Sequence, residues 1–196
     1  MDRNFFRVDR LATLYMSYPL HRIINKKSKF VVPVLMYHSI SSIPDKVSHP
    51  YFQTNTDTAT FHRQMEWLAK NGYRAIPLTK IEEELRRPIL NQRKPFVITF
   101  DDGFRDFLEN AFPILKDFHF TATVFLPTGY VGKRLMKKEC LSWVEVQGLK
   151  AEGIEFGSHT VTHPKLHNLS AATLLQEIGN SKKIIEHYNE SLLVFW

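Results

Sequence analysis

Short apolar runs alternate along this chain with longer stretches in which apolar residues recur every three or four positions. The runs predict buried strands, and the spaced apolar residues predict helices that bury one face. Capping signals delimit some helices: Asp57 or Thr58 opens one that ends near Lys70, at Asn71-Gly72. Strands are expected at 31–40, 73–77, 96–101, 121–126, 154–157 and 192–195, and helices at 57–70, 79–86, 104–118, 142–151 and 170–188.

This order of elements is typical of an α/β protein with a parallel sheet, either open or closed into a barrel. In such folds, ligands and catalytic groups gather at the carboxyl ends of the strands. Two polar segments lie at such ends: Asp101-Asp102 follows the apolar run at 96–100, and Ser158-His159 follows the run at 154–157. We therefore expect these segments to share one site.

The Asp101-Asp102 pair has two interpretations. Adjacent residues of an extended segment point in opposite directions, so both carboxylates face one site only if the chain bends after the strand. Gly103 permits that bend. Alternatively, Asp102 caps the helix that is expected to begin at Phe104. The sequence leaves both interpretations open.

His159 and His163 lie four residues apart, a spacing that brings two imidazoles to one face if the segment forms a helical turn. His167 is an alternative ligand because it has the same spacing from His163, and each histidine could instead be an exposed or hydrogen-bonded residue. One aspartate with two histidines suffices to hold a catalytic divalent metal that keeps a position open for water. With a second aspartate beside that water, the pattern predicts a metal-assisted hydrolase.

His38 and Cys140 are further candidates. His38 ends the first expected strand, where it either lines the same site or closes the strand end through a hydrogen bond. Cys140 lies near Lys137 and Lys138, which could lower the pKa of its thiol, but it lies at no expected strand end or helix start. The sequence also lacks a Gly-x-Ser-x-Gly motif and a phosphate-binding glycine-rich loop.

Length and charge fit one catalytic domain, expected at 30–196, behind an N-terminal extension at 1–29. The formal net charge of +6 is scattered and accompanies no nucleic-acid-binding motif, so we expect no nucleic acid partner. With no evident signal peptide or spanning helix, a cytoplasmic or membrane-peripheral location is expected. The extension could contact a membrane surface as a basic amphipathic helix. Its apolar face would comprise Phe5, Phe6, Val8, Leu11, Leu14 and Tyr15.

Several segments together resemble the polysaccharide deacetylases, metal-dependent carbohydrate esterases that remove N- or O-acetyl groups from glycans. Residues 99–103 resemble the first catalytic motif of that family, and residues 157–164 resemble the second. Residues 34–38, and residues 61–68 followed by 72–74, are similar to the subgroup that acts on poly-N-acetylglucosamine-like polymers. The resemblance runs from about residue 31 to residue 196.

This resemblance implies a deformed (β/α) barrel that hydrolyses acetyl groups from an amino-sugar glycan. It implies that Asp102, His159 and His163 hold one divalent ion, often zinc but cobalt or another ion in some members. Asp101 would be the general base that accepts the proton of the attacking water.

The family's later motifs should follow the helix expected at 170–188, and they usually supply an oxyanion donor, a pocket wall and the general acid. The chain stops at Trp196, about where the third motif would begin, so we expect a barrel truncated at its C-terminus. Two functions therefore stay open: an active deacetylase, or a remnant that binds metal or glycan without turnover. The ligand set also permits hydrolysis of another bond, such as a phosphoester.

Overall fold

A computed structural model of the chain describes residues 31–43, 54–86 and 94–189. The expected extension at 1–29, with its predicted membrane contact, and the expected strand at 192–195 lie outside these residues. In the described part of the chain, no helix combines the length and the apolar character needed to cross a membrane.

The centre of the fold is a five-stranded sheet in which every pairing is parallel. Its longest strand, β5 (Lys94–Phe100), pairs with β1 (Val34–Tyr37), β4 (Tyr73–Ala75) and β6 (Thr123–Leu126), and β6 pairs in turn with β9 (Glu155–Ser158). The carboxyl ends of these strands therefore lie at one edge of the sheet, as the α/β prediction requires.

The strand β5 pairs with three strands, because β4 and β6 both pair along the same side of it, one after the other. Val97 and Asp101 donate backbone hydrogen bonds to the β1 segment, whereas Lys94 bonds the β4 segment. Alternate residues of a strand bond opposite neighbours, so β1 lies on one side of β5 and β4 on the other. By the same alternation β6 follows β4 on that second side, next to the carboxyl end of β5.

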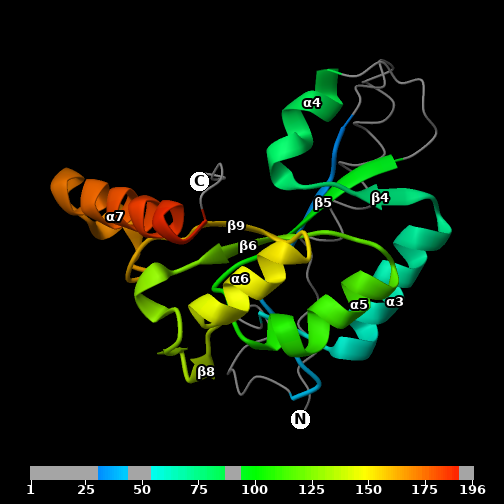
Figure 1. The fold of residues 1–196 in the computed structure, drawn as a ribbon, viewed down its shortest axis with the longest axis horizontal. Helices are drawn as coiled ribbons and strands as arrows, with labels where there is room; N and C mark the ends of the chain where they lie inside the picture. The colour runs from blue at the N-terminus through cyan, green and yellow to red at the C-terminus, as the bar shows by residue number, and fades with distance from the viewer. Residues whose placement is uncertain (1–30, 44–53, 87–93, 190–196) are drawn as a thin grey trace, which may run out of the picture. The chain divides into compact units, whose positions relative to one another are not determined.

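Helices connect the strands (Figure 1). The α-helices are α3 (Thr58–Lys70), α4 (Ile81–Arg86), α5 (Phe112–Asp117), α6 (Trp143–Ala151) and α7 (Ala171–Asn189). Shorter helical segments are η3 (Leu78–Lys80), η4 (Phe107–Ala111), η5 (Thr128–Tyr130) and η6 (Leu166–Asn168). Two small sheets complete the described part: β2 (Ser39–Ile40) with β3 (Asn55–Thr56), and β7 (Arg134–Leu135) with β8 (Lys138–Glu139).

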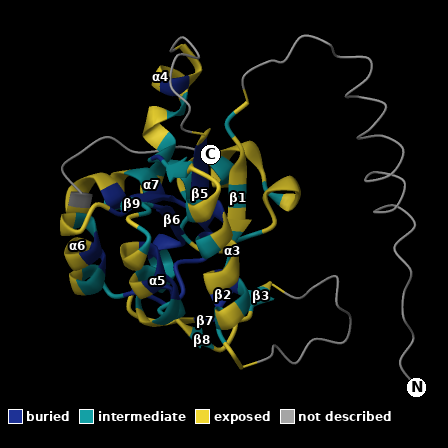
Figure 2. Cartoon of the chain, turned by 90° about the vertical axis from the view of Figure 1, so that its right-hand side faces the viewer, coloured by how far each residue is buried: buried dark blue, intermediate teal, exposed yellow. Residues whose placement is uncertain are grey.

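The core surrounds β5 and β6, whose residues are buried apart from the first residue of β5 (Figure 2). Aromatic rings fill the space between the sheet and the helices that cover it. Phe100 packs edge-on against Phe107 with ring centroids 4.7 Å apart, and it also contacts Phe61 of α3. Burial on both faces explains why these strands read as continuous apolar runs in the sequence.

Two helices end or begin at the residues that the sequence predicts. The Asp57 side chain accepts a hydrogen bond from the Thr60 amide at the start of α3, and Gly72 follows its end with φ +73°. At α6, Ser142 and Glu145 form a reciprocal capping box. These caps satisfy backbone donors that the first turn of a helix leaves unpaired.

Two expectations about local structure are wrong. The expected strand at 31–40 is not continuously buried: Val34 and Met36 of β1 are 48% and 58% exposed. The helix expected from residue 104 begins later, as the π-helical segment η4, and continues into α5. Pro113 lies in the first turn of α5 and has no amide hydrogen for the usual helical bond, which favours the wider turn before it.

Candidate metal centre

The two aspartates follow β5 and the two histidines follow β9, at the same edge of the sheet. The strand β6 lies between β5 and β9. Asp101 directly follows β5, and His159 directly follows β9. The His159 amide donates to the Leu126 carbonyl at 3.0 Å, which fixes the end of β9 against the end of β6. The predicted placement of both segments at the carboxyl ends of parallel strands is therefore confirmed.

A left-handed turn follows β5. Asp102 has φ +69° and Gly103 has φ +57°, and the Leu141 amide donates to the Gly103 carbonyl at 2.9 Å. Two left-handed residues in succession reverse the chain so that neighbouring side chains no longer point to opposite sides. The alternative in which Asp102 caps a helix is wrong, because η4 begins at Phe107 and Asp106 precedes it.

The segment that carries the two histidines is a loop, not the helical turn that the sequence analysis considered. Thr160 and His163 both have positive φ, at +67° and +55°. The Thr128 amide donates to the Thr160 carbonyl at 3.0 Å, and the Gly129 amide donates to the Val161 carbonyl at 2.8 Å. The loop is therefore held against η5, so the backbone rather than helical periodicity sets the orientation of the imidazoles.

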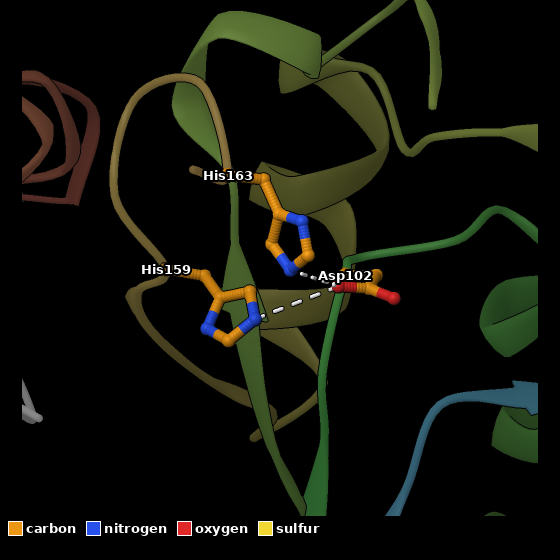
Figure 3. Close-up of side chains that lie close together, drawn as sticks. All are labelled: Asp102, His159 and His163. Atoms are coloured by element: carbon orange, nitrogen blue, oxygen red, sulfur yellow. Dashed lines mark ion pairs between the residues drawn. The ribbon is translucent and has the colours of Figure 1, made fainter. Parts of the chain in front are cut away.

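Asp102, His159 and His163 point toward one another (Figure 3). Oδ1 of Asp102 lies 3.1 Å from Nε2 of His163 and 3.5 Å from Nε2 of His159. One potential ligand atom from each residue lies within 4.8 Å of the others. The structure thus brings together the three residues that the sequence singled out as metal ligands.

The chemistry of these three groups fits a bound cation. Asp102 is 4% exposed, and its Oδ1 atom is buried without a well-aligned hydrogen bond from any described residue. Burial raises the pKa of Asp102, but the two imidazoles outweigh that effect and hold it well below its usual range. A buried, charged carboxylate oxygen is costly unless positive charge or well-aligned donors compensate for it, and a cation would do so. Two imidazoles and one carboxylate are ligands that zinc accepts.

Asp101 and His38 lie close to each other beside this group. Asp101 is 9% exposed, and burial raises its pKa above the usual value, against the opposing effects of His159 and His38. His38 follows β1, and its Nε2 lies 3.8 Å from Oδ2 of Asp101. Of the two roles considered for His38, this distance favours a place beside the site.

Two other candidates do not join the site. His167 is exposed on η6 and does not belong to the metal-ligand group found in the described part of the chain. Cys140 is buried, and burial raises the pKa of its thiol to about 11. The idea that Lys137 and Lys138 could activate this thiol is therefore wrong, since the loss of hydration dominates.

Sequence reasoning missed Glu177 and Ser181, two residues of α7 that contact the histidine segment. Glu177 accepts hydrogen bonds from the backbone of Val161 and Thr162, and Ser181 bonds Ser158. The only sign of them in the sequence is that Glu177 and Ser181 are four residues apart, which places them on one face of the expected helix. That spacing is too common to indicate a role without the structure.

A buried carboxylate facing two imidazoles, with a second aspartate next to it in the chain, is a ligand set that can hold one divalent ion. The sequence model of the polysaccharide deacetylase family matches residues 90–194, which is more than half of the chain. The chain therefore belongs to the polysaccharide deacetylase family.

Two relatives define the extent of the similarity. YxkH of Bacillus subtilis, named as a polysaccharide deacetylase, is 31% identical over 161 residues, which cover 80% of this chain and 52% of that protein. The poly-beta-1,6-N-acetyl-D-glucosamine N-deacetylase of Escherichia coli K12 is 31% identical over 144 residues, covering 66% of this chain and 21% of that protein. The chain thus spans about half or less of the length of these relatives.

The fold also has solved counterparts. A Streptococcus pyogenes deacetylase, PplD, whose structure was solved with acetate, superimposes with a TM-score of 0.70 at 26% identity. The match covers 83% of this chain and 71% of that one. The α/β fold of the deacetylase type, with a parallel sheet that belongs to a deformed barrel, is therefore confirmed.

The turn after β5 gives a direct test of how the site is built. A Cβ atom on Gly103 would lie 2.6 Å from Cδ2 of the buried Leu126 side chain, in a left-handed conformation. We expect Gly103→Ala to lower the free energy of unfolding by about 1–3 kcal/mol in urea titrations. Gly148→Ala is the matched control, because Gly148 lies within α6 with open space around it.

The control should stabilise the protein slightly, by about 0.5–1 kcal/mol, since alanine favours a helix more than glycine does. Equal effects of the two substitutions would contradict the proposed constraint at Gly103.

Proposed function

We propose that this chain is a metal-dependent hydrolase that removes acetyl groups from an amino-sugar glycan. The observation that carries the proposal is the buried Oδ1 of Asp102, which lacks a well-aligned hydrogen bond and faces two imidazoles, with Asp101 next to Asp102 in the chain. The Escherichia coli relative is named for deacetylation of poly-N-acetylglucosamine, and this name supports the substrate class. Membership of the family supports the reaction type.

Asp102, His159 and His163 would hold one divalent ion, most simply zinc, because a mixed nitrogen and oxygen ligand set suits it. The chemistry that such an ion supplies when bound is Lewis acidity, which polarises a carbonyl group and acidifies water. A carboxylate must be deprotonated to bind a metal ion. Because the pKa of Asp102 is lowered, its carboxyl group is negatively charged at neutral pH.

Asp101 is the proposed general base. Asp101 is next to the proposed ligand Asp102 in the chain, and it is buried. Burial raises the pKa of Asp101, and a base with a raised pKa holds a proton more readily at the moment of transfer. The carboxylate accepts a proton from the water that attacks the acetyl carbonyl.

His38 is the proposed proton donor to the departing amine. It follows β1, which lies on the side of β5 away from β6 and β9, and its Nε2 lies 3.8 Å from Oδ2 of Asp101. An amide nitrogen leaves as an amine only after it is protonated, and a donor beside the proposed base is close to the reacting group. Transfer of that proton breaks the carbon–nitrogen bond, which leaves acetate and a free amino group on the sugar.

Substitution of Asp101 separates catalysis from metal binding. Asp101→Asn removes the proton acceptor but no proposed ligand, so acetate release from acetylated glucosamine oligomers should fall by about 10²–10⁴-fold while zinc remains bound. His159→Ala removes a ligand and should abolish both. Acetate can be measured enzymatically and zinc by elemental analysis of the dialysed protein.

Each alternative gives a different pattern. Undiminished turnover by Asp101→Asn would show that this carboxylate is not the base. Stoichiometric zinc in the wild-type chain without any acetate release would favour the non-catalytic remnant, which binds metal or glycan without turnover.

Substrates with different leaving groups test His38. An aryl acetate releases a phenolate that needs no proton, whereas an N-acetyl sugar releases an amine that does. His38→Ala should therefore lower amide hydrolysis by about 10²–10⁴-fold and leave aryl acetate hydrolysis nearly unchanged. A parallel loss on both substrates, as expected for Asp101→Asn, would contradict the donor role and indicate that His38 only orients Asp101.

A further inference from the structure

The loop at 159–163 holds two residues in a conformation that is unfavourable for them. Thr160 and His163 are not glycines, yet both have positive φ. Such a conformation is strained in residues other than glycine, and it persists only where the surroundings enforce it. The backbone of η5 supplies one set of restraints, through the bonds of Thr128 and Gly129 to Thr160 and Val161.

The second set of restraints comes from a single carboxylate of α7. Oε2 of Glu177 accepts from the Val161 amide at 2.8 Å and from the Thr162 amide at 2.9 Å. Oε1 accepts from the Thr162 hydroxyl at 2.8 Å. Three donors on one ionised acceptor form a set of charge-assisted bonds, which are stronger than bonds between neutral groups. Consistently, these hydrogen bonds hold the pKa of Glu177 below its usual value, against the opposing effect of burial.

The helix α7 is itself fixed to the strand that leads into the loop. Ser181 lies one helical turn after Glu177, is fully buried, and accepts a hydrogen bond from Ser158 at 2.7 Å. Ser158 is the last residue of β9 and immediately precedes His159. One face of α7 therefore contacts the chain both just before His159 and between the two histidines, and α7 lies beside β9 (Figure 1).

We propose that Glu177 is a positioning residue of the metal centre. It holds Val161 and Thr162 so that the imidazoles on either side, those of His159 and His163, face the same oxygen of Asp102. The inference rests on the proposed function, because it assumes that these three residues bind a metal. Glu177 contacts the backbone of the loop, and its effect on the ion is exerted through the two histidines.

Cobalt affinity of the full chain tests this role. Glu177→Ala should weaken Co²⁺ binding, measured by competition with a chelator, by about 10–100-fold, and should change the visible absorption of bound cobalt. Glu186→Ala is the matched control, since it also removes a carboxylate from α7. The Glu186 carboxylate pairs with Lys182 at 3.6 Å. The control should bind cobalt with wild-type affinity and spectrum. Glu177→Gln, which keeps an acceptor for the two amides, should lie between the two.

The possible outcomes are distinct. Wild-type affinity and spectrum in Glu177→Ala would overturn the positioning role and leave the metal centre intact. A wild-type chain that binds no cobalt would overturn the proposed function instead. If circular dichroism shows that Glu177→Ala does not fold, the double variant of Glu177→Gln with Thr162→Val replaces it. That variant loses the charge and the hydroxyl bond, and unchanged affinity in it would again overturn the role.

Discussion

The described structure depends on one electrostatic constraint, the burial of the Asp102 carboxylate opposite two imidazoles. A charged oxygen without an aligned donor is unstable in a protein interior unless its surroundings compensate for it. His159 and His163 supply that compensation in part, and they are held at 3.5 and 3.1 Å from Oδ1. In the proposed metal centre, a bound cation would relieve the cost of keeping these groups together.

The rest of the fold serves to hold that arrangement. Parallel strands bring the ends of β1, β5 and β9 to one edge, and β6 keeps the aspartate and histidine segments one strand apart. Left-handed residues then turn each segment inward, at Asp102 after β5 and at Thr160 after β9. Buried aromatic residues pack around β5, and the polar contacts of α7 hold the histidine loop against this frame. Strain at the site is thus balanced by packing and hydrogen bonds elsewhere.

Much of this could be predicted from the sequence, because its signals are local. Apolar runs predict the strands, and the capping residues Asp57 and Ser142 predict where two helices begin. The positions of Asp102 and His159 after such runs indicated the shared edge. The left-handed turns could not be predicted, because Asp102 and Thr160 adopt a conformation that their residue types rarely take and that only tertiary contacts enforce. Glu177 was missed for the same reason: its three donors lie on a separate segment, and no local pattern links them.

The most direct test of this account is to locate zinc by anomalous diffraction in crystals of the full chain grown with that ion. The account predicts one strong peak between Asp102, His159 and His163, with Asp101 beside it but outside the ligand set. An empty position between these three residues, with zinc bound elsewhere or not at all, would contradict the claim that the buried carboxylate and the two imidazoles form the metal centre.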